Sequence, residues 1–283
     1  MGRGRAEGGF TLIELLTVVA IVIILFLITL PILSHSRKRA QAITCLHNLQ
    51  QLQIAWSMYS DDHSGWLPAV KPGAFAGPDR WISGWLDLSS SPDNTNILYL
   101  TDPRYSQIGP YVGNPKIFRC PSDPSFVRIN GKDYKRVRSV SMNCWMNYAG
   151  KEPIEKQGYR VYRKISDMWD PSPSELWIII DERFDSINDG MFVVNMAARG
   201  MMARIVDYPA AYHEHGAGVV FADGHAIVKK WKDPRTTPPT MARTTTIRMG
   251  MPSPHNPDVY WLQEHATAPL PSQQMMPAKM QGY

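Results

Sequence analysis

The sequence predicts an α+β fold in which a long N-terminal helix packs on a small antiparallel sheet with long loops. Residues 10–33 form one apolar run that carries a single charge, Glu14. Apolar residues then recur every three or four positions over 37–59, which is the period of an amphipathic helix. Two further apolar runs, within 217–231, are joined by Asp223-Gly224 and predict a β-hairpin.

The apolar run is long enough to cross a bilayer. About 24 helical residues at a rise of about 1.5 Å each extend about 36 Å. The basic flank after the run does not resemble the small-residue site of a secretory signal, so we expect the run to stay in the mature protein. We therefore predict a transmembrane helix over 10–33 that continues as an amphipathic helix over 34–63 and stops near Gly65.

The rest of the chain predicts a β-rich domain followed by a tail. The domain is expected over 64–232, with long ordered loops in its first half. A continuous apolar run at 175–181 predicts a buried strand, and 191–194 predicts another. Residues 233–283 are rich in Pro, Thr and Met and contain one short predicted helix near 256–263.

Composition excludes several classes of protein. The 283 residues carry a net charge of only +5 with 25 acidic side chains, which argues against a dedicated nucleic-acid binder. Phosphate-loop, dinucleotide-binding, zinc-protease and serine-hydrolase motifs are absent from the sequence. We therefore predict that the protein is not an enzyme and has no nucleic-acid partner.

The N-terminus resembles the signal of type IV prepilins and type II secretion pseudopilins. A short basic leader ends at Gly9 and is followed by Phe10-Thr11-Leu12-Ile13-Glu14. The resemblance implies that a prepilin peptidase removes residues 1–9, and that the new N-terminal Phe10 is methylated. It also implies that Glu14 pairs with the α-amine of a neighbouring subunit, and that the chain has the lollipop architecture of pilins.

A second resemblance lies near the C-terminus. His213, nine intervening residues and then Asp223-Gly224 look like the His-x9-Asp-Gly signature of prepilin-like proteins that are abundant in planctomycetes and verrucomicrobia. Further runs agree with that group: Cys45–Leu52, Tyr59–Pro68, Cys120–Asp123, Ser139–Asn143 and Trp231–Thr237.

Together the resemblances imply a membrane-anchored structural subunit of a type II secretion or type IV pilus-like filament. Its partners would be the prepilin peptidase, other pilin-like subunits, the inner-membrane assembly machinery and membrane lipid. The protein would be single-pass in the inner membrane, with the C-terminal domain periplasmic or extracellular. Counting Lys and Arg around the apolar run favours the opposite orientation. The alternative function is a cell-surface adhesin or glycan-binding module exported through the same pathway.

The signature residues allow two interpretations. In the first, Asp223-Gly224 forms the hairpin turn and His213 hydrogen-bonds a buried acceptor. In the second, His213 and His215 share one face of a strand and bind a metal with Asp223 and His225. We favour the first and predict no cofactor, although a metal such as calcium stays open. A Cys120–His213 thiol–imidazole pair has no supporting motif, and Asp181-Glu182 is interpreted as a strand-end acidic pair.

Three cysteines leave one disulfide to assign. Cys45 and Cys120 match positions where the resembled group often has cysteine, which implies a Cys45–Cys120 disulfide in an oxidising compartment. Cys144 is expected to be a buried free thiol, with Cys120–Cys144 as the other pairing considered.

Two surface features are interpreted structurally. Six tryptophans are expected mainly in the core rather than on a glycan-binding face: Trp66, Trp81, Trp85, Trp145, Trp169 and Trp177. Four basic residues are expected in a solvated loop: Lys132, Lys135, Arg136 and Arg138.

Overall fold

The computed structural model describes residues 9, 11–240 and 245–271, without the side chains of residues 28–35. The chain divides into two compact units, residues 1–40 and 41–283. Helix α1, Leu12–Asp62, begins in the first unit and ends in the second. The other helices and strands are α2 Leu98–Thr101, β1 Phe126–Ile129, β2 Lys132–Lys135, β3 Val140–Asn143, β4 Trp177–Asp181, β5 Met191–Phe192, β6 Arg204–Ile205, β7 Gly216–Phe221, β8 Ala226–Lys230, β9 Met251–Pro252 and α3 Pro257–Glu264.

Helix α1 begins with a capping box. The Glu14 carboxylate accepts hydrogen bonds from the Thr11 backbone N–H at 2.9 Å and from its hydroxyl at 2.8 Å. The Glu14 N–H donates in return to the Thr11 hydroxyl at 3.3 Å, so two free helix-end donors are satisfied. Over 12–27 the large apolar side chains are between 43% and 76% exposed and point to all sides of the helix.

The last part of α1 buries one stripe in the core of the second unit. Cys45, Leu49, Leu52 and Trp56 are each at most 1% exposed, whereas Ile43, at 62%, lies off the stripe. The helix ends at Asp62, one residue before the predicted end at 63. Gly65, at a φ of +80°, then donates its N–H to the Ser60 carbonyl at 2.8 Å, the left-handed ending that glycine favours.

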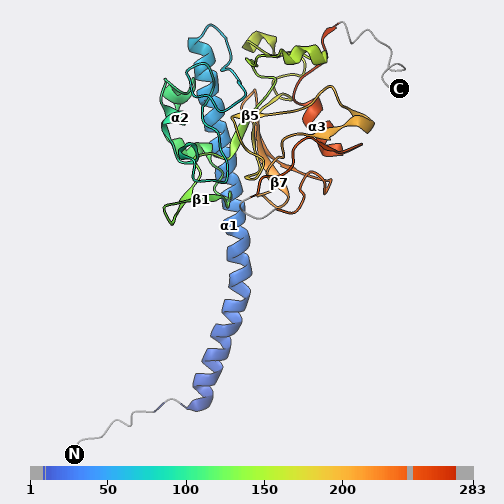
Figure 1. Ribbon diagram of the computed structural model, residues 1–283. Helices are drawn as coiled ribbons and strands as arrows, with labels where there is room; N and C mark the ends of the chain where they lie inside the picture. The colour runs from blue at the N-terminus through green and yellow to red at the C-terminus, as the bar shows by residue number, and fades with distance from the viewer. Residues whose placement is uncertain (1–8, 10, 241–244, 272–283) are drawn as a thin grey trace, which may run out of the picture. The chain divides into compact units, whose positions relative to one another are not determined.

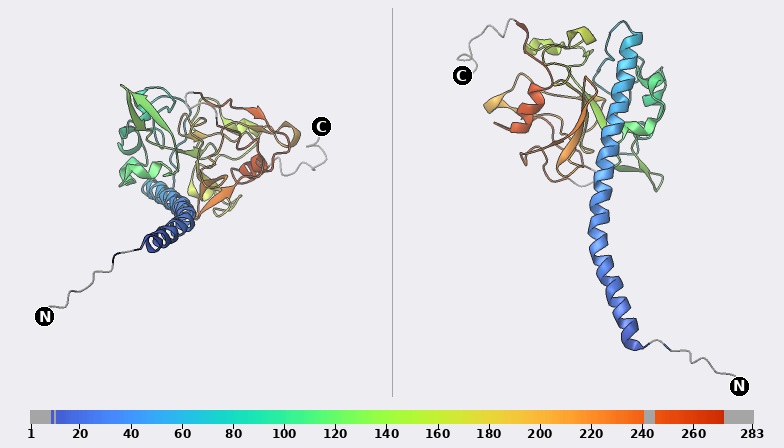
Figure 2. Two further views of the ribbon diagram at one scale, coloured as in Figure 1. Left: turned by 90° about the horizontal axis from the view of Figure 1, so that it is seen from below. Right: turned by 180° about the vertical axis from the view of Figure 1, so that it is seen from behind.

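Behind this stripe lies the main sheet. Among the described residues it has five strands in the order β5-β3-β4-β7-β8. Strand β4 is central and buried at every position, as its unbroken apolar run predicts. Figures 1 and 2 show residues 41–62 of α1 between this sheet and the loop region that contains α2.

The predicted hairpin is confirmed. Strands β7 and β8 pair antiparallel from Gly216↔Lys230 to Val220↔Ala226. Gly224 has a φ of +93° in the connecting turn, a conformation that a residue with a Cβ rarely adopts. The turn contacts α1, because the Gln53 amide donates to the Ala222 carbonyl at 3.2 Å.

The predicted fold class is wrong in two respects. The sheet is mixed rather than antiparallel, because β5 pairs parallel to β3 through Met142↔Met191 and Asn143↔Phe192. The physical reason is the loop after β4. Strand β4 runs antiparallel to β3, and the loop over 182–190 reverses the chain once more. Strand β5 therefore runs in the same direction as β3. Among the residues searched, no helix combines the length and apolarity needed to cross a bilayer, so the predicted transmembrane half of the pilin-like fold is not shown.

The loop-rich first half of the domain contains a hairpin that was not predicted. Strands β1 and β2 pair antiparallel around Asn130-Gly131, whose φ angles are both positive. In the tail, α3 forms where a short helix was predicted, and the Asn256 side chain caps it by accepting from the Asp258 N–H at 2.8 Å. The predicted domain boundaries stay predictions.

Candidate metal centre

Four chemically active side chains from separate segments meet in the core of the second unit. Cys45 comes from α1, Cys120 from the loop before β1, Asp181 from the end of β4 and His213 from the turn before β7. All are buried, with exposed fractions of 5% or less. One ligand atom from each lies within 4.8 Å of the other three, so the cluster can hold a metal ion.

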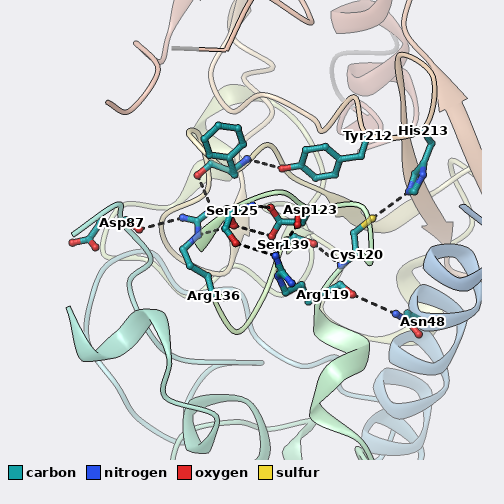
Figure 3. A network of polar contacts seen from close by, with 11 residues as sticks. Asn48, Asp87, Arg119, Cys120, Asp123, Ser125, Arg136, Ser139, Tyr212 and His213 are labelled. Carbon is teal, nitrogen blue, oxygen red and sulfur yellow. Dashed lines mark hydrogen bonds and ion pairs between the residues drawn. The ribbon is translucent and has the colours of Figure 1, made fainter. Parts of the chain in front are cut away.

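The contacts within the cluster are direct. The Cys45 thiol donates to Asp181 Oδ2 at 2.7 Å, and the Cys120 sulfur lies within 4.8 Å of the Cys45 sulfur. Cys120 Sγ lies 3.3 Å from His213 Nε2, and that nitrogen lies 3.7 Å from Asp181 Oδ2. Figure 3 shows the Cys120 sulfur and the His213 ring pointing toward each other.

Local backbone structure explains why these side chains converge. Gly218 of β7 leaves room for them, because a Cβ there would lie 2.9 Å from Asp181 Oδ2 and 3.1 Å from Cys45 Sγ. The Gly218 N–H also donates to Asp181 Oδ2 at 3.3 Å. The Cys120 N–H donates to the Ser139 hydroxyl at 2.8 Å, which ties its loop to the residue before β3.

The cluster changes the acidity of its members. Burial alone would lower the pKa of His213, but hydrogen bonds to Asp181 and Cys120 outweigh it and raise that pKa to about 9. Hydrogen bonding to Cys120, together with burial, raises the pKa of Cys45 well above its usual value. Hydrogen bonds from Cys45 and His213 lower the pKa of Cys120, so this thiol ionises before Cys45.

The geometry fits four ligands arranged around one metal ion better than a nucleophile–base–acid triad. In a nucleophile–base–acid triad, the nucleophile and the acid contact opposite nitrogens of the histidine. Here Cys120 and Asp181 both approach Nε2 of His213. Within the described part of the chain, His213 Nδ1 and Asp181 Oδ1 are buried without hydrogen-bond partners.

The metal set considered from the sequence does not assemble. His213 and His215 do not share a strand face, because Glu214 and His215 have φ angles of +52° and +62° and form a turn. Asp223 pairs instead with His225 at 2.6 Å, and both side chains are exposed. Asp223-Gly224 is therefore a hairpin turn, and His213 alone of that set reaches the cluster.

The cysteine predictions have mixed outcomes. The structure brings Cys45 and Cys120 into contact, but as free thiols, and their disulfide stays a prediction. Cys144 is a buried free thiol, as expected, and burial raises its pKa to about 12. Sequence reasoning missed Asp181 as a partner of the cysteines; its position at the end of an otherwise apolar strand was the available signal.

The tryptophans and basic residues separate into core and surface. Trp81, Trp145 and Trp177 are at most 1% exposed, which confirms the core interpretation for these three, whereas it is wrong for Trp66 and Trp169, which are 45% and 60% exposed. The solvated-loop interpretation is wrong for Arg136 and Arg138. Both are buried and donate to backbone carbonyls, as Arg136 does to the Phe184 carbonyl at 2.7 Å in the network of Figure 3.

At the N-terminus the described residues reach only part of the predicted signal. Gly9 is exposed, and no atom of the described residues lies within 4 Å of the position that a Cβ on it would take. Phe10, predicted as the cleavage and methylation residue, lies outside the described residues, as do residues 1–8.

Comparison with known proteins identifies no relative. No family model matches the chain, and neither a curated protein nor a solved structure matches it significantly. The resemblance to prepilins therefore rests on the sequence motifs alone.

Proposed function

We propose that the protein is a pilin-like filament subunit that a prepilin peptidase processes after Gly9. The observation that carries the proposal is the apolar first part of α1. Over 12–27 its large side chains are at least 43% exposed on every side of the helix. An apolar surface of this extent requires an apolar environment, and bundled copies of the same helix supply one.

Among the described residues, nothing requires glycine at the proposed cleavage site, because none of their atoms lies within 4 Å of the position that a Cβ on Gly9 would take. A requirement for glycine at this position would then come from an enzyme that must approach the backbone closely. This supports a processing site, with the peptidase as the first partner.

Glu14 has two candidate roles that can be separated. As part of the capping box it stabilises the start of α1 within a single chain. As the assembly residue it would place a negative charge opposite the α-amine of a neighbouring subunit. Glutamine at position 14 could still complete the capping box, but it would carry no negative charge.

This difference defines the experiment for the proposal. Glu14→Gln and Glu14→Leu are expressed in the native host, and their incorporation into sheared filaments is compared with that of the wild-type chain. We expect both variants to be incorporated several-fold less, with unchanged cellular amounts, because both lack the charge. If Glu14→Gln assembled normally while Glu14→Leu did not, helix capping rather than intersubunit pairing would explain the residue. Normal assembly of both variants would refute the assembly role.

The proposal includes location at the inner membrane, where prepilin peptidases act, with the C-terminal domain periplasmic or extracellular. Other pilin-like subunits, the assembly machinery and membrane lipid are the expected partners. Calcium is not part of the proposal. That ion takes six to eight oxygen ligands, whereas the buried cluster offers two sulfurs, one imidazole and one carboxylate.

A further inference from the structure

We propose that Cys45, Cys120, Asp181 and His213 form a closed zinc site that fastens α1 to the sheet of the second unit. This inference goes beyond the filament function and does not depend on it. Two sulfurs, one imidazole nitrogen and one carboxylate oxygen are the donors that proteins use for four-coordinate zinc.

The distances suit a zinc ion after small side-chain shifts. Zinc bonds of about 2.0–2.3 Å place tetrahedral donors about 3.3–3.8 Å apart. In the cluster, 3.3 Å separates Cys120 Sγ from His213 Nε2, and 3.7 Å separates His213 Nε2 from Asp181 Oδ2. Cys45 Sγ and Asp181 Oδ2 are 2.7 Å apart and would have to move about 1 Å away from each other. Because all four donors lie within 4.8 Å of one another, shifts of about 1 Å would close the coordination sphere.

The charge of the cluster favours a cation at its centre. The Asp181 carboxyl is 0% exposed, and its ion-pair partner among the described residues is His213, not a lysine or arginine. Its Oδ1 atom is buried without a hydrogen-bond partner in the same part of the chain. A protonated His213 can balance this buried carboxylate in the empty cluster, but two thiolates and the carboxylate together carry more negative charge than one imidazolium balances, and a divalent cation would offset it.

Zinc binding needs only proton release. The ion would be held by two thiolates, one carboxylate and neutral imidazole. The protons that the Cys45 thiol, the Cys120 thiol and His213 Nε2 carry in the empty cluster would all leave as zinc binds, and nothing is oxidised or reduced. A Cys45–Cys120 disulfide would consume both thiolates, so the zinc site and the disulfide exclude each other.

The site is structural rather than catalytic. Four protein ligands complete the preferred coordination of zinc, and all four are buried, so no position stays open for substrate. The ion would join α1, two loops and the end of β4, and consecutive members of the cluster are between 32 and 75 positions apart along the chain.

The test measures zinc in the full-length chain, purified in detergent without chelator. We expect about one zinc ion per chain by mass spectrometry of the metal, and a sulfur-to-metal absorption band after exchange with Co²⁺. Asp181→Asn should weaken zinc binding by at least about 100-fold. Cys144→Ser, which removes a buried thiol outside the cluster, should keep the full zinc content.

Measurements on the wild-type chain keep the proposal testable if the cluster variants fail to fold. Chelation should lower its melting temperature and expose the Cys45 and Cys120 thiols to alkylation together. A wild-type chain that contains no zinc and gives no cobalt band after reduction would overturn the proposal. Recovery of a linked Cys45–Cys120 peptide from the native chain would overturn it as well.

Discussion

Replacing Gly218 by alanine should destabilise the second unit through overpacking. The new Cβ would lie 2.7 Å from Leu49 Cδ1, 2.9 Å from Asp181 Oδ2 and 3.1 Å from Cys45 Sγ. The leucine end can rotate away, but Asp181 Oδ2 is held by the Cys45 thiol and by the Gly218 N–H. Overpacking of this kind costs about 1–3 kcal/mol of folding stability. Alanine offsets about 0.4–1 kcal/mol of that loss, because it lowers the conformational entropy of the unfolded chain.

The net expectation for Gly218→Ala is a loss of about 1–2 kcal/mol. For a unit of this size, that lowers the melting temperature by roughly 2–8 °C, measured by near-ultraviolet circular dichroism of the full chain. The matched control is Gly113→Ala, because Gly113 has no positive φ and, apart from its chain neighbours, no described residue has an atom within 4 Å of its Cβ position. A Gly218→Ala chain as stable as the Gly113→Ala control would refute this account of how α1, β4 and β7 pack.

Two further predictions concern separate regions. Burial raises the pKa of Asp207 to about 8, so the fold favours the protonated carboxyl group. The stability that this group contributes is fully present below about pH 4, where it is protonated in the unfolded chain as well, and is lost as the pH rises through 8. Asp207→Asn should therefore flatten the fall of melting temperature between about pH 5 and 8, and equal slopes in both chains would contradict this. Gly9→Val should block processing in cells without changing the melting temperature of the purified chain, because no atom of the described residues lies within 4 Å of that Cβ position; a processed variant on an immunoblot would show that glycine is not required.

Local sequence patterns predict the helices, strands and turns whose buried positions follow the repeat of a helix or a strand. The stripe of α1 through Leu49, Leu52 and Trp56, the apolar run of β4 and the Asp223-Gly224 turn are all visible in the sequence, because each is decided by neighbours a few positions away. The Asn130-Gly131 turn was visible in the sequence, because both residues suit the positive φ angles of a tight turn. The hairpin was missed because the strands beside that turn are short and partly charged, so they lack an apolar pattern.

The metal centre could not be predicted in the same way. Its four members come from α1, two loops and β4, and only tertiary packing places them together. The sequence drew attention to His215 and His225 because they are close to His213 along the chain. The turn at Glu214 separates His213 from both, whereas Asp181 reaches His213 across the sheet.

The mass of the native N-terminal peptide tests the proposed function most directly. The protein is isolated from cells with an active prepilin peptidase, digested, and its first peptide identified by tandem mass spectrometry. We predict a peptide that begins at Phe10 and carries one added methyl group on its amine. A native chain that still begins at Met1, or at any residue other than Phe10, would contradict the proposal that this protein is a processed filament subunit.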